Sequence, residues 1–498
     1  MKKTVICKKS NYNISIPISE EKYLIYNSLS NGFSLLNQQE YTLLEDQNQL
    51  AFDPEDQFAP NDFFKTLLEH GFIVPQEIDE LNLIEEYYQQ ARNSDEILTL
   101  TIAPTIGCNF ACDYCFQEHD NKSGMSEEVQ EKIYEFVTYV ADHRPHQLKH
   151  LHVCFYGGEP LLKMNIVKNL ASWFIQFCDS RNINYTSDIV TNGFLLNSKT
   201  AKELYEHRVT QCQVTLDGNQ KMHDARRHLL SKRGTFDKII SNIVSYIDEV
   251  PIFTNIRVNI DKRNVSEVHD LIEYLSSINL NNRENLKIYF APVESTTSAC
   301  KEVEMFALEK NEMAQSIFEL YALAVEKGLH TIVMPPRMMG LCTAVKKNGF
   351  VIAPNGDCHK CWDIITYSKL RIGTIFDFKE LLDKQFNHEH RKWHDFSPFK
   401  NEVCRDCKIL PNCVSSCAYK FIYSADVNGI SVLPCPDWKF NIKKKLAFVA
   451  LKLGIISELD YEKATLSTNR TELSLSSKFH TVESMTNFPS KNSLRVIS

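Results

Sequence analysis

The sequence predicts an α/β protein whose central part is a partial, TIM-like (β/α)6 barrel, with a small α+β domain before it and a cysteine-rich domain after it. From Leu98 onward, strand patterns alternate with amphipathic helix patterns. The first 95 residues lack this alternation, and eight of the 16 cysteines lie between Cys342 and Cys435. We therefore expect domains at residues 1–95, 96–330 and 331–440, and a C-terminal helix with a disordered tail at residues 441–498.

The barrel prediction rests on six strand patterns and the helix patterns between them. The strands are expected at residues 98–104, 150–158, 187–195, 209–218, 254–261 and 285–293. The helices are expected at residues 126–143, 164–181, 235–250, 265–278 and 313–328. Strands that alternate with helices pair in parallel through right-handed crossovers, so these elements build a barrel or a doubly wound sheet.

Two of these strands carry polar residues at every second position, which places the polar side chains of each strand on one face. In a parallel sheet covered by helices, the apolar face meets the helices, so the polar face lines an open and solvated barrel. Two solvent-facing strands of an antiparallel sheet are the alternative. The polar residues are Gln211, Gln213, Thr215 and Asp217 in one strand, and Asn255, Arg257, Asn259 and Asp261 in the other.

Composition and charge exclude several classes of protein. With 43% hydrophobic residues and a net charge of −8, the chain is typical of a globular protein and offers no general positive field to nucleic acid. Lys8 and Lys9 interrupt any signal-peptide core, and Lys452 interrupts an apolar stretch that is too short to span a bilayer. We therefore expect a cytoplasmic protein without nucleic-acid or membrane partners, whose cysteines stay reduced and free to bind metal.

Three cysteines follow the first barrel strand at a spacing that points to a metal cluster. Cys108, Cys112 and Cys115 share one loop, and such a triplet is rare by chance among 16 cysteines in 498 residues. Three thiolates hold three irons of a four-iron cluster and leave the fourth iron without a protein ligand, which is typical of a reactive centre. A zinc site completed by His119 is the alternative.

The triplet, with the aromatic Tyr114 before its last cysteine, resembles the signature of the radical S-adenosylmethionine (SAM) superfamily. Residues 156–160, Tyr-Gly-Gly-Glu-Pro, are similar to that superfamily's segment that contacts the methionine amino group of SAM, where glycines admit the ligand and a carboxylate pairs with an ammonium. TNGFLL and TLDGNQKMHDARR continue the resemblance at the third and fourth strands. It implies SAM contacts from Tyr114, Gly157, Gly158, Glu159, Asn192, Thr215 and Arg227. A turn cap for Asn192 and a surface ion pair for Arg227 are the structural alternatives.

The C-terminal cysteines resemble the seven-cysteine SPASM pattern, which holds two auxiliary four-iron clusters. The resemblance implies a complete set formed by Cys404, Cys407, Cys413 and Cys435. It also implies a set that is one ligand short, formed by Cys342, Cys361 and Cys417, for which Cys358 is the available fourth ligand. Two zinc ribbons are the alternative.

Over residues 98–437 the resemblance implies a radical SAM enzyme with SAM and three [4Fe-4S] clusters, one that binds SAM and two that are auxiliary. It implies that SAM yields a 5′-deoxyadenosyl radical, which abstracts hydrogen from the substrate, and that a flavodoxin- or ferredoxin-type donor supplies the electron. An iron–sulfur redox sensor or electron carrier that uses no SAM is an alternative of another class, but it would not need Gly157, Gly158 and Glu159.

The N-terminal segment carries the substrate prediction. Residues 12–18 and 23–29 predict a hairpin, and residues 38–46 and 61–71 predict helices. This order resembles the winged-helix domain that binds leader peptides of ribosomally made natural products, with a generic interaction domain or barrel cap as the alternative. We therefore expect a peptide maturase that installs a thioether or carbon–carbon crosslink in a precursor peptide.

An anaerobic sulfatase maturase, which forms formylglycine with the same set of clusters, is the nearest alternative enzyme. Those maturases carry a catalytic Asp directly after the second cysteine of the first auxiliary group. The present sequence has Trp362 at that position and Asp363 one residue further on.

Overall fold

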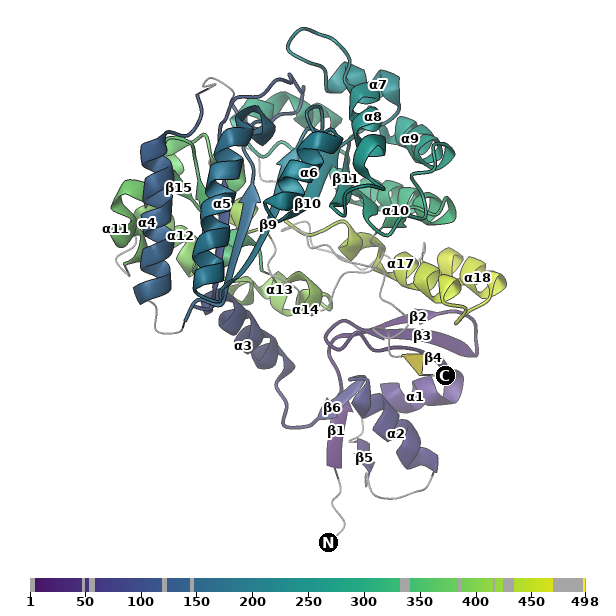
Figure 1. Cartoon of the computed structure of the whole chain (residues 1–498). Coiled ribbons are helices and arrows are strands. Elements are labelled where there is room, and N and C mark those ends of the chain that lie inside the picture. The colour runs from purple at the N-terminus through teal and green to yellow at the C-terminus, as the bar shows by residue number, and fades with distance from the viewer. Residues whose placement is uncertain are drawn as a thin grey trace.

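The computed structural model describes residues 5–46, 50–52, 59–118, 123–143, 147–331, 341–383, 387–414, 417–423, 434–468 and 496–497. Its centre is a ten-stranded sheet in the order β13-β12-β11-β10-β9-β8-β7-β14-β15-β16 (Figure 1). Six neighbouring strands pair in parallel: β7 (Ile97–Ile102), β8 (His150–Phe155), β9 (Asn184–Thr191), β10 (Val209–Thr215), β11 (Phe253–Ile260) and β12 (Leu286–Pro292). The α/β prediction and its six strands are confirmed, and the linear strand order leaves the barrel open.

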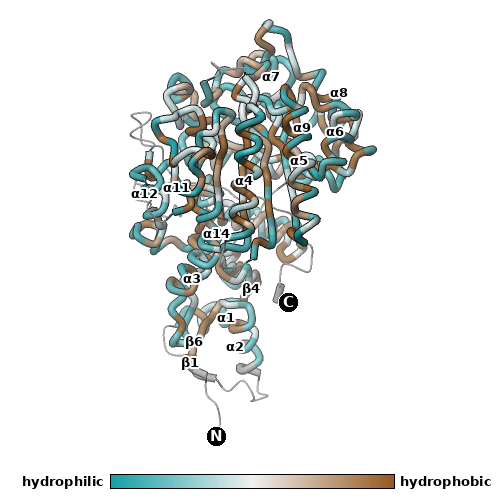
Figure 2. Tube along the Cα trace, turned by 60° about the vertical axis from the view of Figure 1, so that its left-hand side comes forward, coloured by the Kyte–Doolittle hydropathy of each residue, from teal (hydrophilic) through white to brown (hydrophobic). Residues whose placement is uncertain are grey.

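Helices separate these strands along the chain, and all of them except α7 pack apolar side chains against the sheet (Figure 1). Figure 2 shows the hydrophobic strands running behind α4 and α5. The helices are α4 (Glu127–His143), α5 (Met164–Ser180), α6 (Ser198–Glu206), α7 (Gln220–Arg226), α8 (Phe236–Tyr246), α9 (Val265–Ser277) and α10 (Lys310–Glu326). The five expected helices are present, whereas α6 and α7, at 9 and 7 residues, are too short for periodicity to predict.

The alternating faces of β10 and β11 also lie as expected. Their apolar residues, such as Val214 and Val258, belong to the core shared with the helices. On the opposite face Gln211 is exposed, whereas Asp217 and Asp261, just beyond the carboxyl ends of the strands, are fully buried. Because β10 and β11 are parallel, the antiparallel alternative is excluded.

The cysteine-rich segment extends the barrel sheet instead of forming a detached module. β14 (Gly349–Ile352) pairs in parallel with β7, and β15 (Asp357–His359) and β16 (Gly373–Thr374) follow in antiparallel order, while β13 (His330–Thr331) lies at the other edge. The remaining elements are single turns and short helices: η1 (Pro160–Lys163), η2 (Ser298–Phe306), η3 (Thr343–Val345), η4 (Trp362–Ile364), η5 (Ser368–Leu370), η6 (Ile375–Asp377), α11 (Phe378–Leu382), α12 (His388–Asp395), η7 (Pro398–Lys400), α13 (Glu402–Arg405), α14 (Leu410–Cys413) and α15 (Ala418–Ile422).

The N-terminal segment forms two small sheets with three helices. β2 (Asn13–Pro17) and β3 (Lys22–Asn27) form the expected antiparallel hairpin, and β4 (Phe33–Asn37) pairs with the other side of β3. The second sheet has the order β5 (Leu50–Phe52), β1 (Val5–Lys9), β6 (Ile73–Pro75). The helices are α1 (Gln38–Glu45) and α2 (Ala59–Glu69), both expected, and α3 (Glu80–Asn93).

The C-terminal helices pack on the N-terminal sheet. α17 (Trp438–Lys452) and α18 (Glu458–Thr468) lie above β2 and β3 in Figure 1, and Ile16 and Leu24 share a core with Ile442 and Leu446. β17 (Val496–Ile497) pairs in parallel with β4, and the rest of the expected disordered tail, beyond the end of α18, lies outside the described residues. Within the described residues no helix is both long and apolar enough to cross a membrane.

Candidate functional site

The loop that carries the cysteine triplet follows β7 and is tied to two neighbouring segments by main-chain hydrogen bonds. The Gly158 N–H donates to the Thr105 carbonyl (3.0 Å), and the Glu159 N–H donates to the Gly107 carbonyl (2.9 Å). On its other side, the Ala111 N–H donates to the His228 carbonyl (2.9 Å). These bonds fix the loop at the carboxyl ends of the barrel strands.

The three thiols of this loop interact with one another. Burial raises the pKa of Cys108 to about 11, and the charges of Glu159 and Cys115 add to the shift. Burial likewise raises the pKa of Cys112 to about 12, with Cys115 and Cys108 adding to it and Arg227 opposing it. Because raised pKa values keep the thiols protonated, a bound metal must displace these protons, which couples metal binding to pH.

The two glycines after β8 are required by the cysteine loop itself. Gly157 has φ +112°, and a Cβ on it would lie 2.3 Å from the Thr105 carbonyl oxygen. A Cβ on Gly158 would lie 2.2 Å from the Ile106 carbonyl oxygen and 2.4 Å from that of Gly107. The sequence predicts that these glycines allow a close approach of the ligand. The structure adds a second reason for them, the close approach of two protein loops.

Glu159 is fully buried and serves as an internal brace. Its Oε1 accepts hydrogen bonds from the Thr191 hydroxyl (2.7 Å) and the Leu161 N–H (3.0 Å), and its Oε2 accepts one from the Asn192 N–H (2.7 Å). Burial raises its pKa, and these donors oppose the shift. The carboxylate thus joins the ends of β8 and β9, and a contact with SAM stays a prediction.

Asn192 connects the end of β9 to the cysteine loop. Its Oδ1 accepts from the Phe194 N–H (3.0 Å), which is the turn cap foreseen as its structural role, and its Nδ2 donates to Asn109 Oδ1 (2.7 Å). Asn242, which the motifs did not indicate, donates from Nδ2 to the carbonyls of Gly193 (2.9 Å) and Phe194 (2.8 Å). In the sequence, only the amide side chain on the buried face of α8 could have indicated a role for Asn242.

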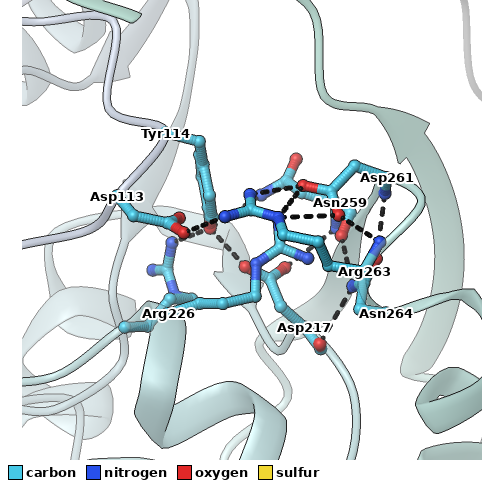
Figure 3. A network of polar contacts seen from close by, with 9 residues as sticks. Asp113, Tyr114, Asp217, Arg226, Asn259, Asp261, Arg263 and Asn264 are labelled. Carbon is cyan, nitrogen blue, oxygen red and sulfur yellow. Dashed lines mark hydrogen bonds and ion pairs between the residues drawn. The ribbon is translucent and has the colours of Figure 1, made fainter. Parts of the chain in front are cut away.

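Tyr114 is the centre of a polar network that clamps the loop to β10 and β11 (Figure 3). Its hydroxyl donates to Asp217 and accepts from Arg227 Nη1 (2.5 Å) and Asn259 Nδ2 (3.1 Å). Burial raises the pKa of Tyr114 well above its usual value, so the phenol stays protonated and can donate. Its hydroxyl is fully used within the protein.

The same network holds two adjacent arginines at the floor of the site. Arg226 pairs with Asp261 (3.0 Å), which also binds Arg263, and Arg263 reaches Asp113 of the cysteine loop (Figure 3). Arg227 is buried rather than at the surface, so the surface ion pair foreseen as its alternative is wrong. Within the described residues, Arg226 Nε and Nη1 and Arg227 Nε have no hydrogen-bond partner.

Thr215 is the last residue of β10, two residues before Asp217. Its side chain is buried, and its hydroxyl makes no hydrogen bond in the part of the chain that the structure describes. The free hydroxyl and the unused guanidinium nitrogens are donors available to a polar ligand such as the amino-acid part of SAM.

The C-terminal thiols divide into two electrostatic groups. The pKa of Cys361 is raised well above its usual value by burial, then by Asp363, Cys417 and Cys342. The pKa of Cys404 is raised to about 12 by burial, then by Cys435 and Cys407. The pKa of Cys413 is raised by burial and by the same three thiols, those of Cys435, Cys407 and Cys404.

Cys358 belongs to neither group. It lies in β15, fully buried in the hydrophobic core, where its thiol contacts the Gly356 carbonyl (3.7 Å). Burial and Asp357 raise its pKa, and no other thiol contributes. The structure therefore argues against Cys358 as the fourth ligand of the first auxiliary set, because the strand turns its side chain into the core.

The first auxiliary group lies near the cysteine loop. The Trp362 ring stacks on Tyr156, the residue before Gly157, with ring centroids 5.5 Å apart. Burial raises the pKa of Tyr156, and both Asp363 and Cys115 add to the shift. The charge of Asp363 also raises the pKa of Cys417, so this carboxylate is near both Tyr156 and an auxiliary thiol.

These thiols fit clusters better than single ions. Among the described residues, no three His, Cys, Asp or Glu side chains have the arrangement that holds one metal ion, although the thiols interact within each group. Thiolates of a four-iron cluster bind different irons and so lie further apart than the ligands of one ion. His119, the alternative zinc ligand, lies outside the described residues.

Residues 102–275 match the model of the radical SAM superfamily, so this segment has the fold of a radical SAM domain, a family that implies SAM and a [4Fe-4S] cluster. The chain is similar in sequence to anaerobic sulfatase-maturating enzymes. A cysteine-type enzyme of this kind from Clostridium novyi (strain NT) is 24% identical over 344 residues, which cover 64% of this chain and 87% of that protein.

Other relatives extend this relationship. The radical SAM cyclopropyl synthase TigE of Paramaledivibacter caminithermalis is 23% identical over 304 residues, covering 53% of this chain and 62% of that protein. Among solved structures, native anSMEcpe with bound AdoMet and Cp18Cys peptide superposes with a TM-score of 0.55 at 20% identity, covering 75% of this chain and 99% of that one. This likeness shows the fold.

Proposed function

We propose that the chain is a peptide maturase that uses SAM and three [4Fe-4S] clusters to install a thioether or carbon–carbon crosslink in a ribosomally made precursor peptide. Cys108, Cys112 and Cys115 would hold the SAM-binding cluster. The auxiliary clusters would be held by Cys342, Cys361 and Cys417, and by Cys404, Cys407, Cys413 and Cys435. When bound, SAM and these clusters supply hydrogen-atom abstraction and one-electron transfer.

The observation that carries this proposal is the contact between the first auxiliary group and the radical site. Making a thioether breaks one C–H and one S–H bond and forms one C–S bond, so a hydrogen atom, a proton and an electron leave the peptide. An oxidative reaction therefore needs an electron acceptor beside the substrate. The stack of Trp362 on Tyr156 supports such a position for the auxiliary thiols, because Trp362 directly follows Cys361.

The chain's own residues hold the reacting groups in place. The Tyr114 network and Glu159 fix the cysteine loop against the ends of β8 to β11, which keeps the site geometry constant through the reaction. Thr215, Asn192, Arg226 and Arg227 present polar groups that would orient the amino-acid part of SAM.

The N-terminal sheet would hold the leader of the precursor peptide by strand addition. β3 is paired on both sides, so β2 is the edge of the hairpin. Edge addition uses main-chain hydrogen bonds for affinity and raises the local concentration of the core peptide at the site. Because β2 and β3 share a core with α17, deleting residues 1–95 would damage the whole molecule, and hydrogen exchange is the better test. We expect added leader peptide to protect the amides of Asn13–Ile16; unchanged exchange there would contradict leader binding at this edge.

A second candidate is a sulfatase-maturase-like enzyme that forms formylglycine. This candidate is favoured by Asp363. Its charge raises the pKa of Tyr156, Cys361 and Cys417, so its carboxylate is near these groups and would be available there to accept a proton. A carboxylate near the auxiliary thiols supports this candidate even though Trp362 takes the position directly after Cys361.

The deciding experiment is anaerobic reconstitution with iron, sulfide, SAM and dithionite. Release of 5′-deoxyadenosine would establish SAM cleavage, and its absence would favour an iron–sulfur sensor. The full-length chain is then given candidate precursor peptides and a sulfatase-derived Cys peptide. A product that has lost two hydrogen atoms and resists fragmentation between two residues indicates a crosslink, whereas a product that reacts with a hydrazide indicates formylglycine.

A further inference from the structure

A basic loop with an apolar tip is attached directly to the cysteine triplet. Residues 228–234, which we name the 228–234 loop, connect α7 to α8 and project at the top of the molecule beside α7 (Figures 1 and 2). The Leu230 N–H donates to the Asn109 carbonyl (3.0 Å), and the His228 carbonyl accepts from Ala111 (2.9 Å). Asn109 and Ala111 lie between Cys108 and Cys112, so this loop is joined by main-chain hydrogen bonds to the loop that would hold the SAM-binding cluster.

The surface around this loop is positively charged, whereas the whole chain has a negative net charge. Residues 219–238 contain six basic and two acidic residues, whereas the chain has a net charge of −8. Asp224 accepts hydrogen bonds from the Thr235 and Phe236 N–H groups, and Asp237 accepts one from Gln220, so neither carboxylate pairs with a surface cation. Arg226 and Arg227 are buried in the site; the exposed cations are Lys221, Lys232, Arg233 and Lys238.

The tip of the loop is rigid and apolar. Leu230 is 54% exposed, although it lies two residues from the exposed cation Lys232. The turn beneath it is closed by the Leu229 N–H, which donates to the Arg233 carbonyl (3.0 Å), and by the Lys232 N–H, which donates to Leu229 (2.8 Å). An exposed leucine on a hydrogen-bonded turn that also carries the exposed cations Lys232 and Arg233 has the composition of a small, transient docking surface.

We propose that the 228–234 loop is the docking surface for an acidic, low-potential one-electron carrier of the flavodoxin or ferredoxin class. The proposal rests on the proposed function, because a centre that cleaves SAM by reduction must receive one electron from outside. The carrier is oxidised by one electron, the cluster held by Cys108, Cys112 and Cys115 is reduced by one, and no atom is transferred. Electron transfer slows steeply with distance, and main-chain hydrogen bonds join this loop to Asn109 and Ala111, the neighbours of Cys108 and Cys112.

The test compares two electron sources with the full-length, reconstituted enzyme. The loop variant carries Lys232→Glu and Arg233→Glu, and the control variant carries Lys65→Glu and Lys369→Glu, which change the net charge equally at exposed lysines elsewhere. The probes are a purified bacterial flavodoxin and a bacterial ferredoxin, both acidic. Binding is measured by titration at low and at high salt, and 5′-deoxyadenosine release is measured with each carrier and with dithionite.

We expect the loop variant to bind both carriers about tenfold more weakly at low salt, to lose most of the salt dependence, and to slow carrier-driven SAM cleavage by a similar factor. Dithionite-driven cleavage should match the wild type, and the control variant should match it in every assay. Leu230→Ser should weaken binding at high salt as well, because the apolar contact is not screened.

Three outcomes would overturn the proposal. The first is unchanged carrier affinity in the loop variant, or a wild-type enzyme that neither carrier binds. The second is an equal fall of dithionite-driven and carrier-driven cleavage, which would make the loop a support for the cysteine loop. The third is a selective loss of peptide binding, which would make it a substrate surface. Absence of dithionite-driven cleavage in the wild type would instead contradict the proposed function.

Discussion

The cysteine loop after β7 and the auxiliary cysteines are both built from thiols, but the protein fixes them in different ways. Neutral and charged hydrogen bonds from the ends of β8 to β11 hold the loop. Glu159 is the centre of one group of these bonds, and Tyr114 is the centre of the other. The auxiliary segments consist of short strands, single turns and short helices, and a largely buried ion triad ties them to the barrel. In that triad Glu294 pairs with Lys310 (2.6 Å) and with Lys420, three residues after Cys417.

The difference teaches which kind of site can be recognised in a sequence. The loop, Gly157, Gly158 and Glu159 lie on consecutive βα units, so their motifs are short and each glycine or carboxylate has a local cause. The first auxiliary group joins Cys342 to Cys417 across 75 residues, and its fixation depends on Glu294, which no motif marks. Variants that disrupt one region and leave the other intact test the two regions separately.

The largest effect is expected from the thiols themselves. Cys112→Ala should reduce SAM cleavage to the background rate, because the loop then offers two thiols to a cluster that needs three. Cys404→Ala with Cys407→Ala should leave SAM cleavage measurable but abolish product formation. Release of 5′-deoxyadenosine and mass spectrometry of the peptide measure the two steps. If the auxiliary double variant modified peptide at the wild-type rate, the auxiliary thiols would be structural only.

The second effect tests the ion triad. Burial alone would raise the pKa of Glu294, but the ammonium groups of Lys310 and Lys420 outweigh it and lower the pKa to about 2. Because the ionised form is favoured in the folded state, Glu294 contributes stability above its unfolded pKa of about 4.5, and this stability is lost as the pH falls toward about 2. Glu294→Gln should therefore lower the free energy of unfolding at pH 7 by on the order of 3 kcal/mol.

Urea unfolding of the wild type and Glu294→Gln at several pH values measures this contribution. The gap between the two proteins should narrow below about pH 4.5, and the exposed control Glu302→Gln should show no gap at any pH. Iron retained by the auxiliary groups should fall with stability, whereas dithionite-driven SAM cleavage should persist. A gap that stayed constant with pH would show that the lost contact is not electrostatic.

Much of the fold could be predicted from the sequence, because period-two and helical patterns of apolar residues indicate directly which side chains are buried. Strands β7 to β12 follow these patterns. Other features depend on contacts that no local pattern encodes. Asn242 reaches two carbonyls on another βα unit, and α17 covers the N-terminal sheet more than 400 residues away along the chain. The unpartnered nitrogens of Arg226 are likewise visible only once Asp261 and Tyr114 are placed around it.

The third effect concerns the clamp on the cysteine loop. Tyr114→Phe removes the hydroxyl that satisfies Asp217, Arg227 and Asn259, so we expect a loss of about 1–2 kcal/mol in the free energy of unfolding. The looser loop should raise the KM for SAM about tenfold while iron content stays unchanged. The exposed Tyr205→Phe is the matched control and should behave as the wild type. An unchanged KM for SAM would mean that the network stabilises the fold without positioning the site.

The smallest effect distinguishes a core cysteine from a ligand. Cys358 is fully buried among apolar side chains and interacts with no other thiol, whereas Cys361, three residues later, interacts with Cys342 and Cys417. Cys358→Ala should therefore keep the wild-type iron content and lower the free energy of unfolding by about 1 kcal/mol, the cost of a small cavity.

Two controls fix the meaning of that result. Cys178→Ala removes another fully buried thiol, in α5, and should cost a similar amount of stability without any loss of iron. Cys361→Ala should lose about four irons per chain, because it removes a member of the first auxiliary group. If Cys358→Ala lost as much iron as Cys361→Ala, the thiol would have to leave the core to complete that group. β15 would then have to rearrange on cluster binding, and the two regions would differ less than their present geometry indicates.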